Sequence, residues 1–316
     1  MYENGGRFNG GSGKLRESCA NGRKKGQQMQ LAALSREAPI LIAGPTASGK
    51  SGLAMELAAR DGRVVVNADA LQVYANWRIL TARPSPEDEA QVPHALYGHI
   101  ARDQPYSVGH WLREVADVLN RPVVIVGGTG LYFRALTEGL VEIPAISPQT
   151  RALANARMLA EGSRALLAEL DPPTAEKIDR SNPARVQRAW EVLHQTARGL
   201  ASWHHSTPAA VLPLSNCEPV VLRPDVGWLD ARISLRFHQM LRAGALDEVA
   251  SESPFWDPAR PSSRAIGAAE LMDHLRNERS LEDATQAAIL ASRQYAKRQR
   301  TWLRTRMAKW REIAVQ

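Results

Sequence analysis

The residues best suited to chemistry form a glycine-rich loop at positions 44–51, with the sequence Gly-Pro-Thr-Ala-Ser-Gly-Lys-Ser. An apolar run, Ile40–Ala43, precedes the loop and a helix-like stretch follows it. This order is typical of a phosphate-binding loop, in which backbone N–H groups at a helix N-terminus face one anion. Lys50 adds a positive charge, and the Ser51 hydroxyl can bind Mg²⁺. The pattern predicts a polyphosphate site but does not specify ATP.

Two further polar segments come directly after apolar runs. Val64–Val66 leads to Asp69, and Val123–Val126 leads to Gly127-Gly128-Thr129-Gly130. Because ligands bind at the carboxyl ends of strands in open α/β sheets, we expect Asp69 near the phosphate-binding loop. Its carboxylate can ligate Mg²⁺, take a proton from an attacking group, or simply cap a helix. The glycines allow close backbone approach and Thr129 offers a hydroxyl, although a plain tight turn also explains them.

Basic residues concentrate in two segments of this chain, whose net charge is +7 at pH 7. Residues 293–312 hold eight Lys and Arg and one acid, and residues 1–30 hold six and two. A basic stripe on one element is typical of a protein that binds a phosphate backbone, and a solvated helix face gives the same pattern. Tyr295 and Trp302 lie within the stripe, where they can pack in the core or stack on bases.

The elements that must position these residues indicate an α/β fold. Short apolar runs, each followed by a turn and a helix-like stretch, predict a parallel sheet covered on both faces. Between 145 and 205 strand-like runs vanish and helix formers dominate, which predicts a helical insertion into a core formed by 39–144 and 206–316. Residues 1–38, rich in Gly, Asn, Ser and basic residues, are predicted to be a disordered leader. A strand over 219–222 and helices over 52–60, 151–170, 185–196, 229–243 and 283–309 complete the expected elements.

Composition excludes several classes of protein. No run of about 18 apolar residues occurs, so no membrane span is expected. The two cysteines, Cys19 and Cys217, are far apart in the sequence. They exclude a disulfide scaffold or a cysteine-rich zinc site and favour a reducing, cytoplasmic setting. Nothing in the sequence specifies an oligomer, so a monomer is the default expectation.

Five segments taken together resemble the bacterial tRNA dimethylallyltransferase family, also called tRNA isopentenyltransferases, over residues 39–312. The resemblance implies a P-loop NTPase-like, nucleotide-kinase-like core whose helical insertion, 145–205, binds the anticodon stem-loop of tRNA. It implies that dimethylallyl diphosphate donates its five-carbon group to the exocyclic amine of the adenine 3′ of the anticodon, releasing diphosphate. The segments are Gly44–Ser51, Asn67–Tyr74, Thr81–Pro84, Val126–Tyr132 and Gln294–Trp302.

The resemblance also implies a role for individual residues. Asp69 is the expected base, with Thr129 and Lys50 as the other catalytic residues and Ser51 as the ligand of Mg²⁺. The expected diphosphate-binding residues are Gly44, Thr46, Ala47, Ser48, Gly49, Lys50 and Ser51. The expected tRNA-binding residues are Asp69, Ala70, Leu71, Gln72, Thr129, Arg151, Ala184, Arg185, Val186, Gln187, Arg188 and Arg264, the last within the segment Arg264–Ala269.

The chain departs from the family pattern at four positions, where Ala70, Ala75, Val226 and Ala268 replace polar or larger residues. By the family pattern, each departure would remove a phosphate or base contact worth on the order of 1–3 kcal/mol. A catalytically weakened tRNA-binding homologue is therefore one alternative. A P-loop small-molecule kinase is another, because the cores are similar, although no lid with paired arginines for a γ-phosphate stands out.

Overall fold

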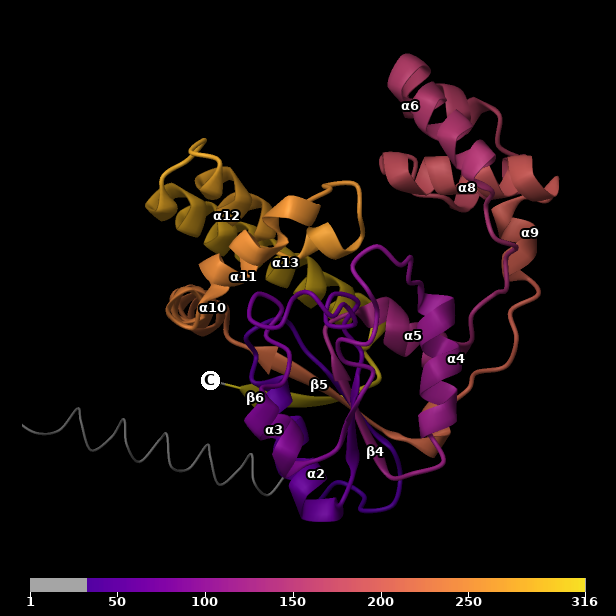
Figure 1. Ribbon diagram of the computed structural model, residues 1–316. Helices are drawn as coiled ribbons and strands as arrows, with labels where there is room; N and C mark the ends of the chain where they lie inside the picture. Colours follow the sequence, from indigo (N-terminus) through magenta and orange to yellow (C-terminus); the bar gives the residue numbers. More distant parts are fainter. Residues whose placement is uncertain (1–32, 316) are drawn as a thin grey trace, which may run out of the picture. The chain divides into compact units, whose positions relative to one another are not determined.

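The structure, a computed structural model, describes residues 33–315. Six strands form one sheet in the order β3-β2-β4-β1-β5-β6, and every neighbouring pair is parallel (Figure 1). The predicted parallel α/β sheet is thus confirmed. The strands are β1 Ile40–Ala43, β2 Val64–Asn67, β3 His94–Ala95, β4 Val123–Gly127, β5 Glu218–Pro224 and β6 Arg311–Val315.

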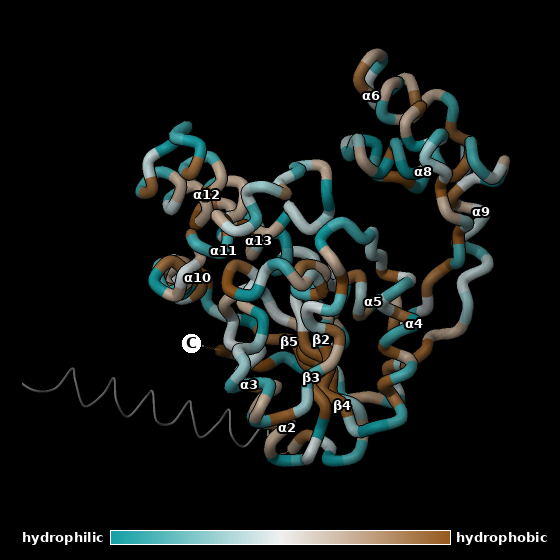
Figure 2. The backbone as a smooth tube through the Cα atoms, viewed as in Figure 1, coloured by the Kyte–Doolittle hydropathy of each residue, from teal (hydrophilic) through white to brown (hydrophobic). Residues whose placement is uncertain are grey.

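The central strands are apolar along their whole length because both of their faces are covered. Every residue of β1, β2 and β4 is buried. Strands buried on both faces read as continuous Val and Ile runs rather than alternating patterns. Figure 2 shows these strands as the most hydrophobic part of the chain, and Figure 1 shows α2 (Lys50–Asp61) and α4 (Val108–Val118) on opposite sides of the sheet.

A second layer of helices follows β5. Their apolar faces enclose a core cluster that includes Phe237, Leu271 and Ile289, together with Trp77 from the loop after β2. This cluster also takes in Ala47 of the phosphate-binding loop, so the loop packs against these helices. These helices are α10 Val226–Arg242, α11 Ala245–Glu252, α12 Ala268–Leu275 and α13 Leu281–Arg306, with the 3₁₀ turns Ser253–Phe255 and Ser262–Arg264 between them. Two other short pieces, α3 Pro86–Gln91 and the 3₁₀ turn Leu214–Asn216, come before β5 in the chain.

The chain divides into two compact units. One contains the sheet and comprises the described residues up to Phe133 and from Leu214 onward. The other runs from Arg134 to Pro213, a wider span than the insertion expected at 145–205. Its core joins Ala154, Leu166 and Trp190. Its helices are α6 Pro148–Ala168, kinked at Gly162 where φ is +74°, α7 Pro172–Lys177, α8 Pro183–Thr196 and α9 Leu200–His204, and α5 Gly130–Glu138 joins it to the sheet-containing unit.

The predicted disorder of residues 1–38 is wrong for positions 33–38. Leu34 is 3% exposed and belongs to the core cluster formed between the sheet and α2. The fully buried guanidinium of Arg63 donates hydrogen bonds to the carbonyl oxygens of Ser35, Ala38 and Val123. This buried cation orders the segment before β1, a long-range contact with no local sequence signal. Positions 1–32 lie outside the described residues.

Two strands were not anticipated from the sequence. β6 is an edge strand with a mostly exposed pattern, and basic residues precede it, so it reads as a continuation of the helix expected at 283–309. That helix, α13, ends at Arg306 instead. β3 has only two residues. None of the described helices combines the length and apolar character needed to span a bilayer.

Candidate active site

The phosphate-binding loop connects β1 to α2 and forms a concave backbone surface. Ala47 and Gly49 both have positive φ, at +61° and +88°. Successive N–H groups in such conformations converge on an anion-binding concavity. Gly49 is also the N-cap of α2 and offers no capping side chain, so the N–H groups of the first helical turn remain available. The buried hydroxyl of Ser48 has no hydrogen-bond partner in the described structure.

Lys50 is the first residue of α2, directly after the loop. Its Nζ donates to the Pro45 carbonyl at 3.3 Å, so the side chain folds back over the loop. Burial lowers the pKa of Lys50 to about 8, an effect that nearby Asp69 opposes and nearby Arg236 reinforces. A desolvated ammonium next to one carboxylate is well placed to bind a phosphate group that enters the loop.

Asp69 lies in a tight turn after β2 that does not lead into a helix. No helix begins between β2 and Pro86, which removes the helix-cap interpretation of this residue. Buried Asn67 holds the turn: its Oδ1 accepts from the Asp69 N–H at 2.8 Å, and its Nδ2 donates to the carbonyls of Asp69 and Leu96. Asp69 Oδ1 accepts from the Leu71 N–H at 3.0 Å. The carboxylate is therefore held by local backbone geometry, and sequence analysis missed the part that Asn67 plays.

The turn after β4 packs directly against the Asp69 turn. Thr129 Oγ1 accepts from the Ala70 N–H at 3.0 Å, and the Thr129 N–H donates to the Ala68 carbonyl at 3.2 Å. A β-carbon at position 127 would overlap that same Ala68 carbonyl. Gly127 is thus required by close approach of two backbones rather than by a tight turn alone.

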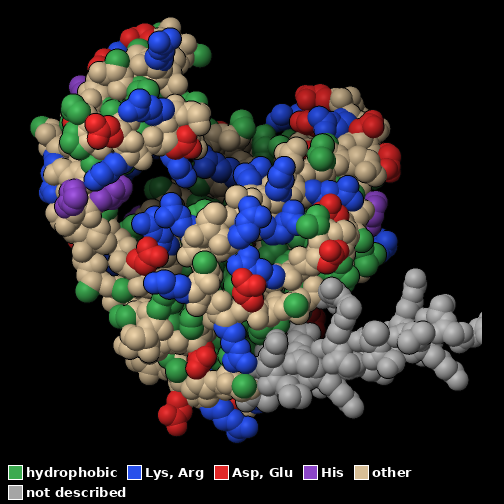
Figure 3. Space-filling view, turned by 180° about the vertical axis from the view of Figure 1, so that it is seen from behind, with side chains coloured by type: hydrophobic (Ala, Val, Ile, Leu, Met, Phe, Trp, Pro, Cys, Tyr) green, Lys and Arg blue, Asp and Glu red, His purple; other side chains and the backbone are tan. Residues whose placement is uncertain are grey.

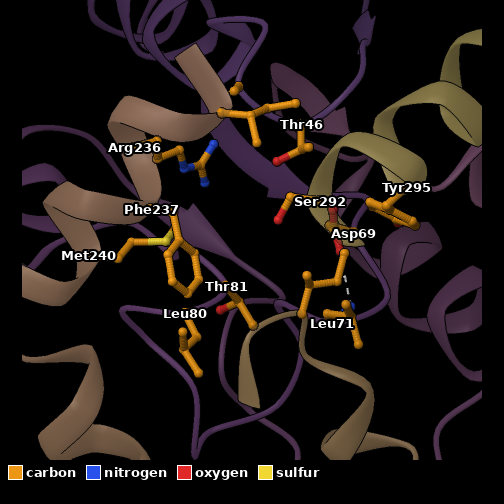
Figure 4. A pocket seen from close by; sticks show the side chains of 13 residues that line it. Thr46, Asp69, Leu71, Leu80, Thr81, Arg236, Phe237, Met240, Ser292 and Tyr295 are labelled. Atoms are coloured by element: carbon orange, nitrogen blue, oxygen red, sulfur yellow. Dashed lines mark hydrogen bonds between the residues drawn. The ribbon is translucent and has the colours of Figure 1, made fainter. Parts of the chain in front are cut away.

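A pocket joins the phosphate-binding loop to Asp69 (Figure 4). Thr46 and Ala47 of the loop line it, and Asp69 and Tyr295 lie opposite Arg236. The remaining wall is largely apolar and is formed mainly by Leu71, Leu80, Ile233, Phe237, Met240 and Ile266. A pocket with anion-binding groups, one carboxylate and an apolar wall suits a small organic diphosphate.

Two arginines of α10 were not identified from the sequence: one lines the pocket and the other bonds to the phosphate-binding loop. Arg236 lines the pocket, and burial lowers its pKa. Arg232, one helical turn earlier, donates from Nε to the Ala47 carbonyl at 3.0 Å. Their spacing of four residues puts them on one face of the helix, which is a signal that the sequence does carry. The sequence does not show that this face of the helix points toward the phosphate-binding loop.

The expected tRNA-binding residues fall into both units. Ala70, Leu71 and Gln72 continue the Asp69 turn, where Gln72 Nε2 donates to the carbonyls of Thr81 and Ala82 and so holds the loop together. Arg264 ends the 3₁₀ turn before α12. The others, Arg151 and Ala184–Arg188, belong to the Arg134–Pro213 unit.

Within that second unit, one buried carboxylate organises three of these side chains. Glu191, whose side chain is 3% exposed, lies 3.3 Å from Arg151 and 3.7 Å from Arg188. Gln187 Nε2 donates to Glu191 Oε1 at 3.1 Å. Both arginines keep about half of their side chains exposed. The unit therefore presents two oriented guanidinium groups to the solvent.

Most of the basic stripe lies on α13, and its last members, Lys309 and Arg311, follow that helix. The face drawn in Figure 3 carries a band of Lys and Arg side chains. A surface hollow lined by Arg223, Lys297, Arg300 and Arg304 adjoins this helix and the end of β5. Trp302 packs against Gly130, whereas Tyr295 lines the pocket.

Two of the four departures from the family pattern differ in surroundings. Ala268 is fully buried at the start of α12, so in this chain the position has no surface to offer a ligand. Val226 is 49% exposed at the start of α10 and borders the hollow lined by Arg223.

A metal at this site would depend on the substrate for most of its ligands. Among residues 33–315, no group of three or more His, Cys, Asp and Glu can hold a metal ion. Ser51 is exposed in the first turn of α2, next to the loop that faces the anion. A hydroxyl together with diphosphate and water oxygens suits Mg²⁺, which keeps several waters and binds through substrate phosphates. The residues present therefore fit this cation.

A parallel sheet with a phosphate-binding loop after β1 and an acid after β2 defines a P-loop protein with a nucleotide-kinase-like core. The family described as IPP transferase matches residues 72–306, and the one described as isopentenyl transferase matches residues 38–96. The tRNA dimethylallyltransferase of Cereibacter sphaeroides is 60% identical over 289 residues, covering 90% of this chain and 92% of the relative. That of Dinoroseobacter shibae is 57% identical over 289 residues, covering 90% and 97%. The chain belongs to the tRNA dimethylallyltransferase family.

Solved structures agree with this assignment. A tRNA isopentenylpyrophosphate transferase from Bacillus halodurans matches with a TM-score of 0.61 at 30% identity, covering 88% of this chain and 90% of that chain. A eukaryotic dimethylallyltransferase acting on tRNA matches with a TM-score of 0.74 at 22% identity, covering 88% and 74%, and supports the fold.

Proposed function

We propose that this protein transfers a dimethylallyl group from dimethylallyl diphosphate to the exocyclic amine of the adenine 3′ of the anticodon in tRNA. The observation that carries the proposal is the single pocket that Thr46, Ala47, Asp69 and Arg236 share with an apolar wall. A donor with a charged diphosphate end and a five-carbon apolar end matches both halves of this pocket.

The charged half stabilises the leaving group. The C–O bond of the donor breaks and diphosphate departs, so negative charge grows on oxygens that the loop N–H groups, Lys50 and Arg236 face. Preorganised donors aimed at developing charge are commonly the largest contribution to catalysis. We propose Mg²⁺ as the divalent cation at this site, held by Ser51 and the diphosphate, where it would add further positive charge when bound.

Asp69 serves the acceptor. The adenine nitrogen forms the new N–C bond, and its proton passes to the Asp69 carboxylate. A positioned base of this kind contributes roughly 10²–10⁴-fold to rate. The adenine must leave its stack to enter the pocket, so a flipped base is expected. The Asp69 turn, Arg264 and the arginines of the second unit are the proposed RNA contacts, and the protein is proposed to act as a cytoplasmic monomer.

The decisive test is a transfer assay. The purified protein is incubated with Mg²⁺, dimethylallyl diphosphate and an anticodon stem-loop that carries an adenine 3′ of the anticodon, and mass spectrometry follows the RNA. A mass increase of one dimethylallyl group on that adenine supports the proposal. RNA binding without added mass would instead identify a catalytically inactive tRNA-binding protein.

A calorimetric competition separates the transferase from a small-molecule kinase. Dimethylallyl diphosphate should bind with Mg²⁺ more tightly than ATP does, because the pocket wall is apolar where a kinase would need groups for a γ-phosphate and an acceptor. Tighter binding of ATP would overturn the proposal.

A further inference from the structure

Gln299 of α13 is a buried side chain that uses both ends of its amide. It is 6% exposed. Its Oε1 accepts from the Thr46 N–H of the phosphate-binding loop at 2.8 Å, and its Nε2 donates to the Gly128 carbonyl at 3.0 Å. One amide thus bridges the loop after β1 and the turn after β4. The bond to Gly128 is buried and the bond to Thr46 is part-buried, so a lost partner at the Gly128 end leaves a buried polar group unsatisfied, which is costly.

The surrounding residues fit this bridge closely. A β-carbon at position 128 would overlap Gln299 Nε2, so Gly128 leaves the room that the amide fills. One helical turn earlier on α13, Tyr295 lines the pocket close to Thr129 and Gln299. Thr129 in turn accepts from the Ala70 N–H, beside Asp69.

These contacts form a continuous connection across the pocket. It runs from Thr46 through Gln299 to Gly128 and Thr129, and from Thr129 to the Asp69 turn. Its two ends are the loop that faces the leaving group and the residue that faces the acceptor. α13 therefore links the phosphate-binding loop to the Thr129–Asp69 side of the pocket in addition to the sheet.

We infer that Gln299 is a positioning residue that sets the phosphate-binding loop against the Thr129–Asp69 side of the pocket. The inference rests on the proposed function, since it names what aligns donor and base in that reaction. Gln299 acts through Thr46 and Gly128, because both ends of its buried amide are already bonded to the protein. Gln299 therefore affects the alignment of the donor with the base and the conformational order of the phosphate-binding loop. Misplacement of reacting groups by about 1 Å can lower the rate of a reaction a hundredfold.

The test compares Gln299→Met with wild type and with Gln286→Met, a matched change at an exposed position of the same helix. Calorimetry measures binding of inorganic diphosphate with Mg²⁺, and rapid-quench kinetics measures the single-turnover transfer rate. We expect Gln299→Met to weaken diphosphate binding at least fivefold, since the loop is no longer held in its binding conformation. The transfer rate should fall at least tenfold, while anticodon stem-loop affinity and the Gln286→Met variant stay within twofold of wild type.

A second variant separates hydrogen bonding from packing. In Gln299→Glu the carboxylate can still accept from the Thr46 N–H, but it repels the Gly128 carbonyl until it is protonated. Burial raises the pKa of such a carboxyl group. The transfer rate of Gln299→Glu relative to wild type should therefore recover at least threefold between pH 8 and pH 6. A ratio that does not change with pH would contradict the bridging role.

The experiments separate the proposed function of the protein from the proposed role of Gln299. A wild-type protein that transfers no prenyl group refutes the proposed function, while diphosphate binding still decides the role of Gln299. Diphosphate affinity of Gln299→Met within twofold of wild type would overturn the inference, whatever the transfer assay gives.

Discussion

The indole ring of Trp302 occupies the space where a β-carbon on residue 130 would stand, so only glycine fits at position 130 while Trp302 keeps its place. Gly130 begins α5 directly after Thr129, and Trp302 lies on α13, one turn beyond Gln299. Two motifs that are far apart in the sequence thus meet through one glycine. The contact places α13 across the turn that follows β4.

Replacing Gly130 by alanine should destabilise the protein by about 1–3 kcal/mol, because the ring must move out of a packed position. Urea denaturation followed by tryptophan fluorescence measures the change. Gly52→Ala is the matched control, since a β-carbon there meets nothing within 4 Å. Adding Trp302→Leu should recover part of the loss at position 130, and strictly additive losses would show that the ring is not the cause.

Replacing Asp69 by asparagine should lower the single-turnover transfer rate by a factor of about 100 or more, because the amide cannot take the proton of the adenine amine. The turn should survive, since the asparagine Oδ1 can still accept from the Leu71 N–H. Anticodon stem-loop affinity is therefore expected to change little. The transfer rate and the affinity of the exposed control Asp103→Asn should both stay near wild type. Turnover equal to wild type would remove Asp69 as the base.

Donor binding should weaken as the pH rises through 8. Burial lowers the pKa of Lys50 to about 8, so its ammonium is mostly charged at pH 7 and mostly neutral at pH 9. The diphosphate end of the donor favours the charged form, and its dissociation constant should therefore rise roughly tenfold over this range. Calorimetry with dimethylallyl diphosphate in the absence of RNA measures the effect.

The matched variant for this pH dependence is Lys50→Arg, which stays charged throughout. Its donor affinity should be weaker at pH 7, because the guanidinium is larger, but nearly constant up to pH 9. An equally steep pH dependence in the arginine variant would assign the effect to another group.

Replacing Arg63 by methionine should cost about 3–5 kcal/mol of unfolding free energy. The change leaves the buried Asp61 carboxylate without one of its two cationic partners, and three carbonyl oxygens lose a donor. Arg60→Met is the control: its side chain is 25% exposed and it pairs with the same Asp61, so a smaller loss is expected. Proteolysis near residues 33–38 should also speed up in Arg63→Met, and equal losses in the two variants would contradict this role.

Local sequence was sufficient for the β1–loop–α2 unit, because each step depends on neighbours. Four apolar residues make a buried strand, Gly49 permits one of the two positive φ angles of the loop, and a helix follows with free N–H groups. The position of Asp69 beside that loop also followed, since parallel strands end at one edge of the sheet. The basic helix could also be predicted from the sequence, because charge and periodicity are local properties.

Tertiary structure decided which distant side chains share the site. Gln299 meets Thr46 across 253 residues of sequence, and Arg236 reaches the pocket from a helix whose orientation depends on the packing of α10–α13. The ordering of residues 33–38 by Arg63 and the edge strand β6 have the same origin. Such contacts arise only when separate elements pack together, so no periodicity or spacing in the sequence predicts them.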